Sequence, residues 1–304
     1  MNKRERFQHL KGIIAPVITP FDEDENLDEA RFRTLVRYIL DAGVHGISPG
    51  GSTGEGCAIR AEERVRMIGI IREENREGIP IVAGIICHST RDAVSASLQA
   101  KESGADALMV TPLQYLGGTD DDGNYQYYQA ISESVGLPII IYNVIPQNEI
   151  TPELCERLLD IDYVVGIKQS RGGVGGFMDM KLRCGEKGLI YAALDELPYT
   201  TYELGADGEI AAILGLFPAM SMKIWNLYQQ GAVQEGLRLQ QVLYTIWRSI
   251  TGSQFPRRMK AALQCLGIDA GISLSPLCGA SQKELAEIKE AVALYRKHEH
   301  LLDA

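Results

Sequence analysis

Short apolar runs recur along the chain, and each is followed by a segment in which apolar residues return at helical spacing. The runs are too continuous for strands with one solvent-facing side, which indicates parallel strands buried on both faces. They lie at residues 12–17, 46–49, 81–86, 107–110, 139–142, 164–167, 189–193 and 209–213. Eight βα units at a spacing of roughly 20–35 residues predict an α/β fold, the closed (β/α)8 or TIM barrel, with an open doubly wound sheet as the alternative.

One junction between helix and strand recurs in these units. A glycine stands where the helix is expected to end, and a β-branched run follows within a few residues. The glycines are Gly43, Gly78, Gly104, Gly136 and Gly205. From about Trp225 onward the pattern is helical only, with helices expected at residues 234–250, 257–266 and 282–298. The sequence therefore predicts a barrel of residues 1–224 and a C-terminal helical extension of residues 225–304, which covers the barrel or joins subunits.

A glycine-rich stretch, GGSTGEG at residues 50–56, follows the second apolar run. The loops after the strands carry the active site of such a barrel, so this loop is expected to face it. Free backbone N–H groups in a turn that opens a helix favour an anion. The stretch matches neither the phosphate-binding P-loop nor the dinucleotide pattern, so the motif leaves the anion open. Helix capping by Ser52 and Thr53, and a first-turn position for Glu55, are the structural alternatives.

A lysine and a tyrosine lie at the ends of two neighbouring apolar runs. Tyr142 is the last residue of the fifth run and Lys168 directly follows the sixth, so the two side chains are expected to lie close together. An ammonium against the barrel interior is partly desolvated, which favours the free amine, a nucleophile toward carbonyl carbons. This pair predicts Schiff-base chemistry. The alternative is a lysine that extends toward solvent from a strand end beside a half-buried tyrosine.

The composition of the chain indicates which classes of binding partner to expect. The net charge of −10 and the lack of a basic stripe argue against nucleic acid, so small molecules are the expected partners. Six cysteines without a C-x-x-C pair indicate reduced thiols in a cytosolic protein. The charged start and the absence of an apolar stretch of about 18 residues predict a cytoplasmic protein without a leader or a membrane span. The histidines form no ligand cluster, and no metal is expected.

Several short motifs in a fixed order carry a family resemblance. They are GGSTGE after the second run, VTP near Val110, IIIYNV, GIKQS, GADG before the eighth run, and FPRRMKAALQCLGI in the C-terminal region. From about Lys11 to about Leu294 the chain resembles the pyruvate-dependent class I aldolases, the family of dihydrodipicolinate synthase and N-acetylneuraminate lyase. The resemblance implies a homotetramer and a lyase or aldolase that needs no cofactor beyond its covalent imine with the substrate.

The resemblance also implies roles for particular residues. Lys168 would form the imine with the keto carbon of pyruvate or another 2-oxo acid, and Tyr142 would shuttle protons. Ser52 and Thr53, with the backbone at Gly51, would hold the carboxylate of the 2-oxo acid, and Thr53 would also relay protons with Tyr142. The backbone of Ile210 would lie against bound pyruvate.

Other positions depart from the family's patterns and bear on the substrate. Dihydrodipicolinate synthases continue the tyrosine segment to an arginine that binds a second carboxylate, but this chain has Gln147 or Asn148 there, and an amide cannot replace a guanidinium. The family's tyrosine that reaches across a subunit interface is replaced by Gln114, with Tyr115 one residue later. Tyr115 substitutes for it, or the relay is incomplete.

Three further positions can be compared with the neuraminate lyases, the other branch of the family. Their Asp-Glu pair, which binds sugar hydroxyls, is matched by Asp195 and Glu196, whose alternative role is to cap the following helix. Ala212 stands where those enzymes carry a serine, which makes the wall apolar. We therefore expect cleavage or formation of a 2-oxo-4-hydroxy acid, such as a smaller 2-oxo-3-deoxy sugar acid, from or to pyruvate and an aldehyde. The alternatives are dehydration through the same imine, true dihydrodipicolinate synthesis, and non-catalytic binding of a 2-oxo acid.

Overall fold

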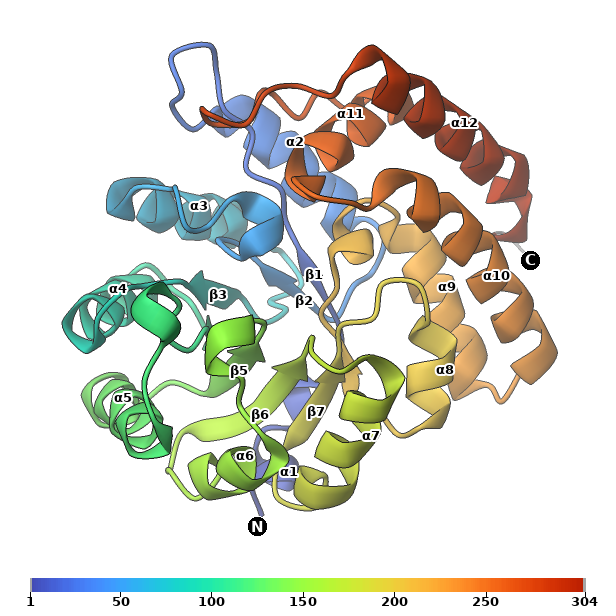
Figure 1. Cartoon of the computed structure of the whole chain (residues 1–304). Helices are drawn as coiled ribbons and strands as arrows, with labels where there is room; N and C mark the ends of the chain where they lie inside the picture. Colours follow the sequence, from blue (N-terminus) through green and yellow to red (C-terminus); the bar gives the residue numbers. More distant parts are fainter. Residues whose placement is uncertain (1, 303–304) are drawn as a thin grey trace.

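A closed barrel of parallel strands forms the centre of the computed structural model, which describes residues 2–302 (Figure 1). Its eight strands within those residues are β1 (Gly12–Pro16), β2 (Gly46–Ser48), β3 (Val82–Ile85), β4 (Ala107–Val110), β5 (Ile139–Asn143), β6 (Val164–Gln169), β7 (Leu189–Ala192) and β8 (Gly208–Glu209). Strands β3 to β8 pair in sequence order, and β1 pairs with both β2 and β8. A bridge between Ile47 and Ile81 completes the ring. The predicted (β/α)8 barrel is confirmed.

A helix follows each strand on the outside of the barrel (Figure 1). These helices are α2 (Glu29–Leu40), α3 (Ala61–Glu74), α4 (Thr90–Glu102), α5 (Asp121–Val135), α6 (Pro152–Leu158), α7 (Gly173–Cys184), α8 (Pro198–Glu203) and α9 (Pro218–Gln229). Side chains of Asp28, Ser89, Asp120 and Thr151 cap α2, α4, α5 and α6 by accepting backbone N–H groups. The five junction glycines all have positive φ, as expected of residues that turn the chain out of a helix.

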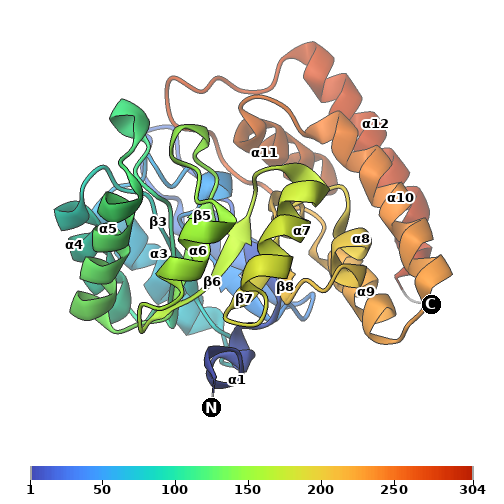
Figure 2. The same ribbon diagram turned by 60° about the horizontal axis from the view of Figure 1, so that its bottom comes forward.

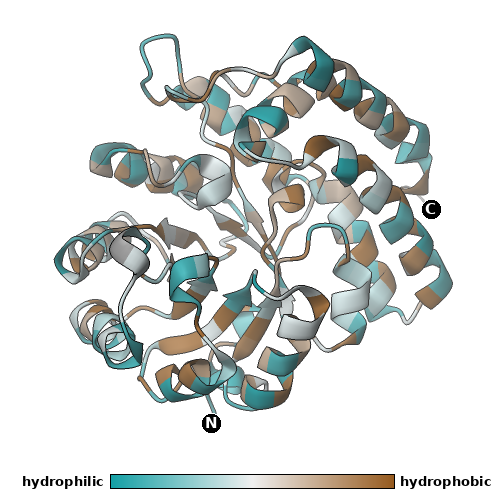
Figure 3. Ribbon diagram, in the orientation of Figure 1, coloured by the Kyte–Doolittle hydropathy of each residue, from teal (hydrophilic) through white to brown (hydrophobic). Residues whose placement is uncertain are grey.

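Apolar side chains fill two layers that the strands separate. The layer inside the barrel includes Ile14, Val82, Met109, Ile140 and Leu189. The layer between strands and helices includes Ile47, Ile85, Leu108, Ile141 and Ile167. Both faces of the strands are therefore buried, which explains why their sequences are continuous apolar runs. Figure 3 shows the hydrophobic colour on the strands and the hydrophilic colour on the outer sides of the helices.

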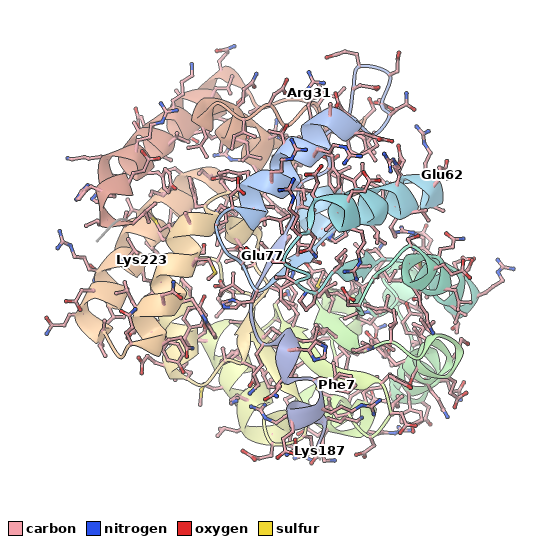
Figure 4. The ribbon with its side chains drawn as sticks, turned by 180° about the vertical axis from the view of Figure 1, so that it is seen from behind. Phe7, Arg31, Glu62, Glu77, Lys187 and Lys223 are labelled. Carbon is pink, nitrogen blue, oxygen red and sulfur yellow. The ribbon has the colours of Figure 1, made fainter. Side chains whose placement is uncertain are left out.

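The N-terminal segment covers one end of the barrel. Helix α1 (Lys3–Arg6) and the 3-10 helix η1 (Gln8–Leu10) lie beneath the strands in Figure 2 and across them, with Phe7 labelled, in Figure 4. Phe7 and Leu10 are buried against the interior layer, and the Lys3 ammonium donates to the Val164 carbonyl at the start of β6. The opposite end, where the carboxyl ends of the strands meet their loops, is the catalytic end of such barrels.

Three helices form the C-terminal region: α10 (Val233–Ile250), α11 (Phe255–Leu266) and α12 (Gln282–His298), followed by the 3-10 turn η6 (Glu299–Leu301). They agree with the predicted helices to within two residues. Helices α10 and α12 lie side by side along the outside of the barrel, whereas α11 reaches the loop after β2 (Figures 1 and 2). The division into residues 1–224 and 225–304 stays a prediction, and its boundary falls within α9.

The eighth apolar run differs from its prediction. A strand was expected over residues 209–213, but β8 is Gly208–Glu209 and Ala212–Gly215 forms the 3-10 helix η5. The Asp195 carboxylate accepts the Ile213 N–H over 2.8 Å, so that donor is not free for sheet pairing. A short apolar run by itself does not distinguish a buried strand from a buried turn of helix.

Candidate active site

Lys168 and Tyr142 lie side by side at the carboxyl ends of β6 and β5. The two residues are partners in the parallel register of these strands. The Lys168 Nζ atom lies 3.8 Å from the centroid of the Tyr142 ring. Each residue is only 5% exposed. The predicted proximity is confirmed, and the alternative of a lysine extended into solvent does not hold because its ammonium is buried against an aromatic face.

The Tyr142 hydroxyl contacts the loop after β2. It donates to the Ser52 Oγ atom over 3.2 Å, and Ser52 is the first residue of the 3-10 helix η2 (Ser52–Gly54). The family resemblance implies a proton relay between Thr53 and Tyr142, but the hydrogen bond of the Tyr142 hydroxyl is to Ser52. Consecutive residues of a 3-10 helix point about 120° apart, so only one of the two hydroxyls can face Tyr142.

The glycine-rich stretch is a compact turn that contains η2 and does not open helix α3 directly. Helix α3 begins at Ala61 with Arg60 as its N-cap, and the N-cap of η2 is Gly51. Neither Ser52 nor Thr53 therefore caps α3, contrary to the structural alternative. The Thr19 hydroxyl donates to the Gly54 carbonyl over 2.7 Å and holds the turn against the loop after β1.

Glu55, expected in the first turn of a helix, has a different environment. It adopts a left-handed backbone with φ of +56°, and its side chain is buried. The carboxylate accepts the Lys260 ammonium over 2.7 Å and the Leu274 N–H over 3.0 Å. These partners come from the C-terminal region, more than 200 residues away in sequence. The sequence near Glu55 held no signal for them.

Asp195 and Glu196 follow β7, at the same end of the barrel. Asp195 accepts the Ile213 N–H and so holds η5 after β8. Burial raises the pKa of Asp195 to about 6, although the Ile213 N–H and the charge of Lys168 oppose this rise. The pair does not cap the following helix, because α8 begins after Leu197 without a side-chain cap. Asp195 is thus within electrostatic range of Lys168, and Glu196 is half-buried beside it.

Two amide side chains with no role predicted from the sequence, Asn143 and Gln169, fix the ends of β5 and β6. The Asn143 side-chain amide donates to Gln169 Oε1 over 2.9 Å and to the Ile150 carbonyl over 2.8 Å, and its oxygen accepts the Ile150 N–H. Asn143 and Gln169 each directly follow one of the paired residues Tyr142 and Lys168. Amides at matching positions of two neighbouring strands are the signal that could have revealed this bond.

The remaining candidates lie in different surroundings. Ile210 is fully buried in the layer inside the barrel. Tyr115 lies in the 3-10 helix η3 (Tyr115–Gly117) and is 77% exposed. Gln147 lies in η4 (Pro146–Asn148) and is also exposed, whereas the neighbouring Asn148 is buried and hydrogen-bonded to Asn124. Neither Tyr115 nor Gln147 therefore belongs to the buried group around Lys168 in this chain.

Residues 2–302 contain neither a cluster of metal-ligating side chains nor a membrane-spanning helix. No group of three or more histidine, cysteine, aspartate or glutamate side chains in that range is placed to hold a metal ion. The helices in the same range include none with the length and apolar character needed to cross a membrane.

Comparisons with known proteins agree with the motifs and with the barrel. A sequence model of the dihydrodipicolinate synthetase family matches residues 9–294. A 4-hydroxy-tetrahydrodipicolinate synthase from Desulfotalea psychrophila is 30% identical over 289 residues, which cover 94% of this chain and 96% of the relative. A dihydrodipicolinate synthase from Bacillus anthracis is 28% identical with a TM-score of 0.87, covering 93% and 97% of the two chains. An N-acetylneuraminate lyase from Fusobacterium nucleatum is 25% identical with a TM-score of 0.85, covering 95% and 99%.

Proposed function

Because this chain belongs to the dihydrodipicolinate synthetase family, we propose that it is a lyase whose Lys168 forms an imine with a 2-oxo acid. The observation that carries the proposal is the buried Lys168 ammonium 3.8 Å from the Tyr142 ring, whose hydroxyl bonds to Ser52. A buried amine beside a hydroxyl pair has both the nucleophile and the proton relay that imine formation needs.

The proposed reaction is the cleavage of a 2-oxo-4-hydroxy acid. The Lys168 amine attacks the C2 keto carbon, and the keto oxygen leaves as water. Tyr142 and Ser52 then take the proton of the C4 hydroxyl, the C3–C4 bond breaks, and its electron pair enters the protonated imine. This step releases an aldehyde and leaves an enamine, which gains a proton at C3. Hydrolysis of the imine releases pyruvate and restores the amine.

The turn of residues 51–53 suits the carboxylate of the 2-oxo acid. Ser52 and Thr53 begin the 3-10 helix η2 after its N-cap Gly51, and the first N–H groups of such a helix lack intrahelical partners and favour an anion. Thr53 is buried in the same turn and supplies a second hydroxyl. We assign Ile210, buried in the adjacent barrel wall, to the apolar contact with the three-carbon unit.

The surroundings favour a substrate smaller than a sialic acid and without a second carboxylate. Neither residue at the position of the family's arginine is a cation, and Gln147 is exposed while Asn148 is bonded to Asn124. Asp195 accepts the Ile213 N–H with one carboxylate oxygen, and we assign its other oxygen and the half-buried Glu196 to substrate hydroxyls. A short 2-oxo-3-deoxy sugar acid fits these features better than the aspartate semialdehyde of a synthase.

We also propose a homo-oligomer in which a second copy covers the exposed Tyr115.

Reduction of the imine tests the chemistry directly. Incubation with pyruvate and borohydride is expected to add a pyruvate-derived mass to Lys168, detected by peptide mass spectrometry. A Lys168→Arg variant keeps the positive charge but has no amine that can form the imine, so it should gain no adduct. Lys181→Arg, on the outer helix α7, is the matched control and should be labelled like the wild type. An unlabelled wild type at saturating pyruvate would contradict the proposal.

A panel of 2-oxo acids separates the reactions that share this imine. Pyruvate together with an aldehyde identifies cleavage, whereas an intact carbon skeleton less one water identifies dehydration. Condensation of pyruvate with aspartate semialdehyde would instead identify a synthase. Adduct formation without turnover of any member of the panel would indicate a binder of 2-oxo acids.

A further inference from the structure

Glu55 joins the turn of residues 51–53 to the C-terminal region through a buried ion pair. The side chains of Glu55 and Lys260 are 3% and 5% exposed, and their charged atoms lie 2.7 Å apart. The second carboxylate oxygen accepts the Leu274 N–H over 3.0 Å. Lys260 also donates to the Ile272 carbonyl and lies 4.8 Å from the Phe21 ring. Both charges are therefore satisfied without solvent.

This bonding fixes a backbone conformation that the turn does not favour by itself. Glu55 directly follows η2, its N–H donates to the Ser52 carbonyl over 3.2 Å, and its φ of +56° is unfavourable for a residue with a Cβ. Such a conformation persists when surrounding contacts hold it. The ion pair and the Leu274 N–H hold the carboxyl side of the turn, and Thr19 holds it at Gly54.

We propose that Glu55 and Lys260 are positioning residues that fix Ser52 and Thr53 for binding of the 2-oxo acid. The inference rests on the proposed function, because it assumes that this turn holds the carboxylate. The pair itself need not touch substrate: it acts through the backbone from Ser52 to Glu55. The C-terminal region is thereby part of the substrate-binding apparatus, since α11 supplies Lys260 and the segment after it supplies Leu274.

Replacement of Glu55 by glutamine tests the pair with little change in shape. The two donors bond to different carboxylate oxygens, so the NH2 group of glutamine would face either the Lys260 ammonium or the Leu274 N–H, donor against donor. We expect the pyruvate concentration for half-maximal borohydride trapping on Lys168 to rise about tenfold, because a small displacement of a binding group has a large effect. The maximal trapping rate should fall as well, since the displaced Ser52 is also the hydrogen-bond partner of Tyr142 in the proton relay. Lys260→Met should act in the same direction, and the double variant should be no worse than the more affected single variant.

Arg258→Met is the matched control on the same helix. Arg258 is also buried and paired, but its partners are Glu284, Glu287 and the carbonyls that end α10, none of which belongs to the turn. We expect this variant to lower the melting temperature while leaving half-maximal trapping unchanged. Equal half-maximal concentrations in the wild type and Glu55→Gln would overturn the positioning role.

The outcomes also separate this inference from the proposed function. A wild type without any adduct would reject the proposed function, whereas normal trapping in Glu55→Gln and Lys260→Met would reject the positioning role alone. An equal shift in Arg258→Met would show a general effect of destabilisation and would overturn the inference. Failure of both pair variants to fold, under conditions in which Arg258→Met folds, would likewise overturn it by showing that the pair supports the whole barrel.

Discussion

Three carboxyl groups lie at the catalytic end and in the wall of the barrel, and their hydrogen-bond partners differ. The Glu55 carboxylate accepts hydrogen bonds from the Lys260 ammonium and from the Leu274 N–H. Asp195 accepts one backbone N–H, and burial raises its pKa to about 6. Glu209, on β8, is fully buried, and its bonding partner is the Tyr202 hydroxyl. Burial raises the pKa of Glu209 to about 8, against the opposing effect of the Tyr202 hydrogen bond.

The raised pKa of Glu209 predicts a loss of stability with rising pH. The folded state keeps a proton that the unfolded state releases near the ordinary value of 4.5, so the free energy of unfolding should fall between pH 4.5 and about 8. Glu209→Gln keeps an acceptor for Tyr202 without this titration. It should stabilise the protein by up to about 5 kcal/mol at pH 9, with little effect at pH 4.5.

Urea denaturation across this pH range measures the effect of Glu209→Gln. The exposed Glu62→Gln on α3 is the control and should leave the pH profile of the wild type unchanged. A profile for Glu209→Gln parallel to that of the wild type would show that Glu209 is not the group responsible.

At the scale of elements, β3 and the loop after β2 depend on a close backbone approach. A Cβ atom at Gly84, in β3, would lie 2.5 Å from the Gly50 carbonyl carbon and 2.6 Å from the Gly51 nitrogen. Gly50 itself has a φ of +73°, in the left-handed region that favours glycine. The turn that carries Ser52 is thus set by contact with a neighbouring strand as well as by its own glycines.

Gly84→Ala is expected to displace this turn. The clash involves backbone atoms, so a side-chain rotation cannot relieve it, and the stability loss should be about 1–3 kcal/mol. Pyruvate trapping on Lys168 should weaken as well. Gly175→Ala, in α7, is the control because its Cβ would meet no atom within 4 Å, and it should be neutral or slightly stabilising. Melting temperatures and trapping curves check both variants, and unaltered trapping in Gly84→Ala would contradict the expected displacement.

At the scale of the whole molecule, Asp207 joins segments that are distant in sequence at the N-terminal end of the barrel. Its carboxylate lies 2.6 Å from the Arg4 guanidinium, 3.2 Å from the Lys11 ammonium and 3.7 Å from that of Lys181. It also accepts the Ile190 N–H over 3.0 Å. Burial alone would raise the pKa of Asp207, but the bonds from Arg4 and Ile190 lower it below its ordinary value.

Asp207→Asn should destabilise the protein most at neutral pH. A carboxyl whose pKa is lowered on folding stabilises above its unfolded pKa and loses this contribution as the pH falls through the folded pKa. We expect a loss of about 3 kcal/mol at pH 7, because the variant leaves Arg4 without its buried partner. Denaturation at pH 7 and pH 3 measures the difference, which should shrink at pH 3. Half-maximal pyruvate trapping should be unchanged, since Asp207 lies at the end of the barrel away from Ser52.

Local pattern was sufficient for most of the fold and for part of the site. Continuous apolar runs and junction glycines predicted the strands because both faces of each strand are buried. The strand predicted at residues 209–213 was too long, because its second half belongs to η5, where the Ile213 N–H donates to Asp195. The placement of Lys168 beside Tyr142 was predictable because consecutive strands of a parallel barrel are neighbours and each residue lies at the end of its run.

The sequence by itself determined the barrel, its family and the Lys168–Tyr142 pair, since periodicity, motif order and strand adjacency are all written along the chain. Only the tertiary structure decided that Ser52 rather than Thr53 meets Tyr142, and that Glu55 binds Lys260 and Leu274. The physical reason is distance along the chain and direction of the side chain. Consecutive side chains in η2 point in different directions, so the backbone conformation decides which hydroxyl faces Tyr142. The partners of Glu55 lie more than 200 residues away, and the sequence around Glu55 contains no pattern that predicts them.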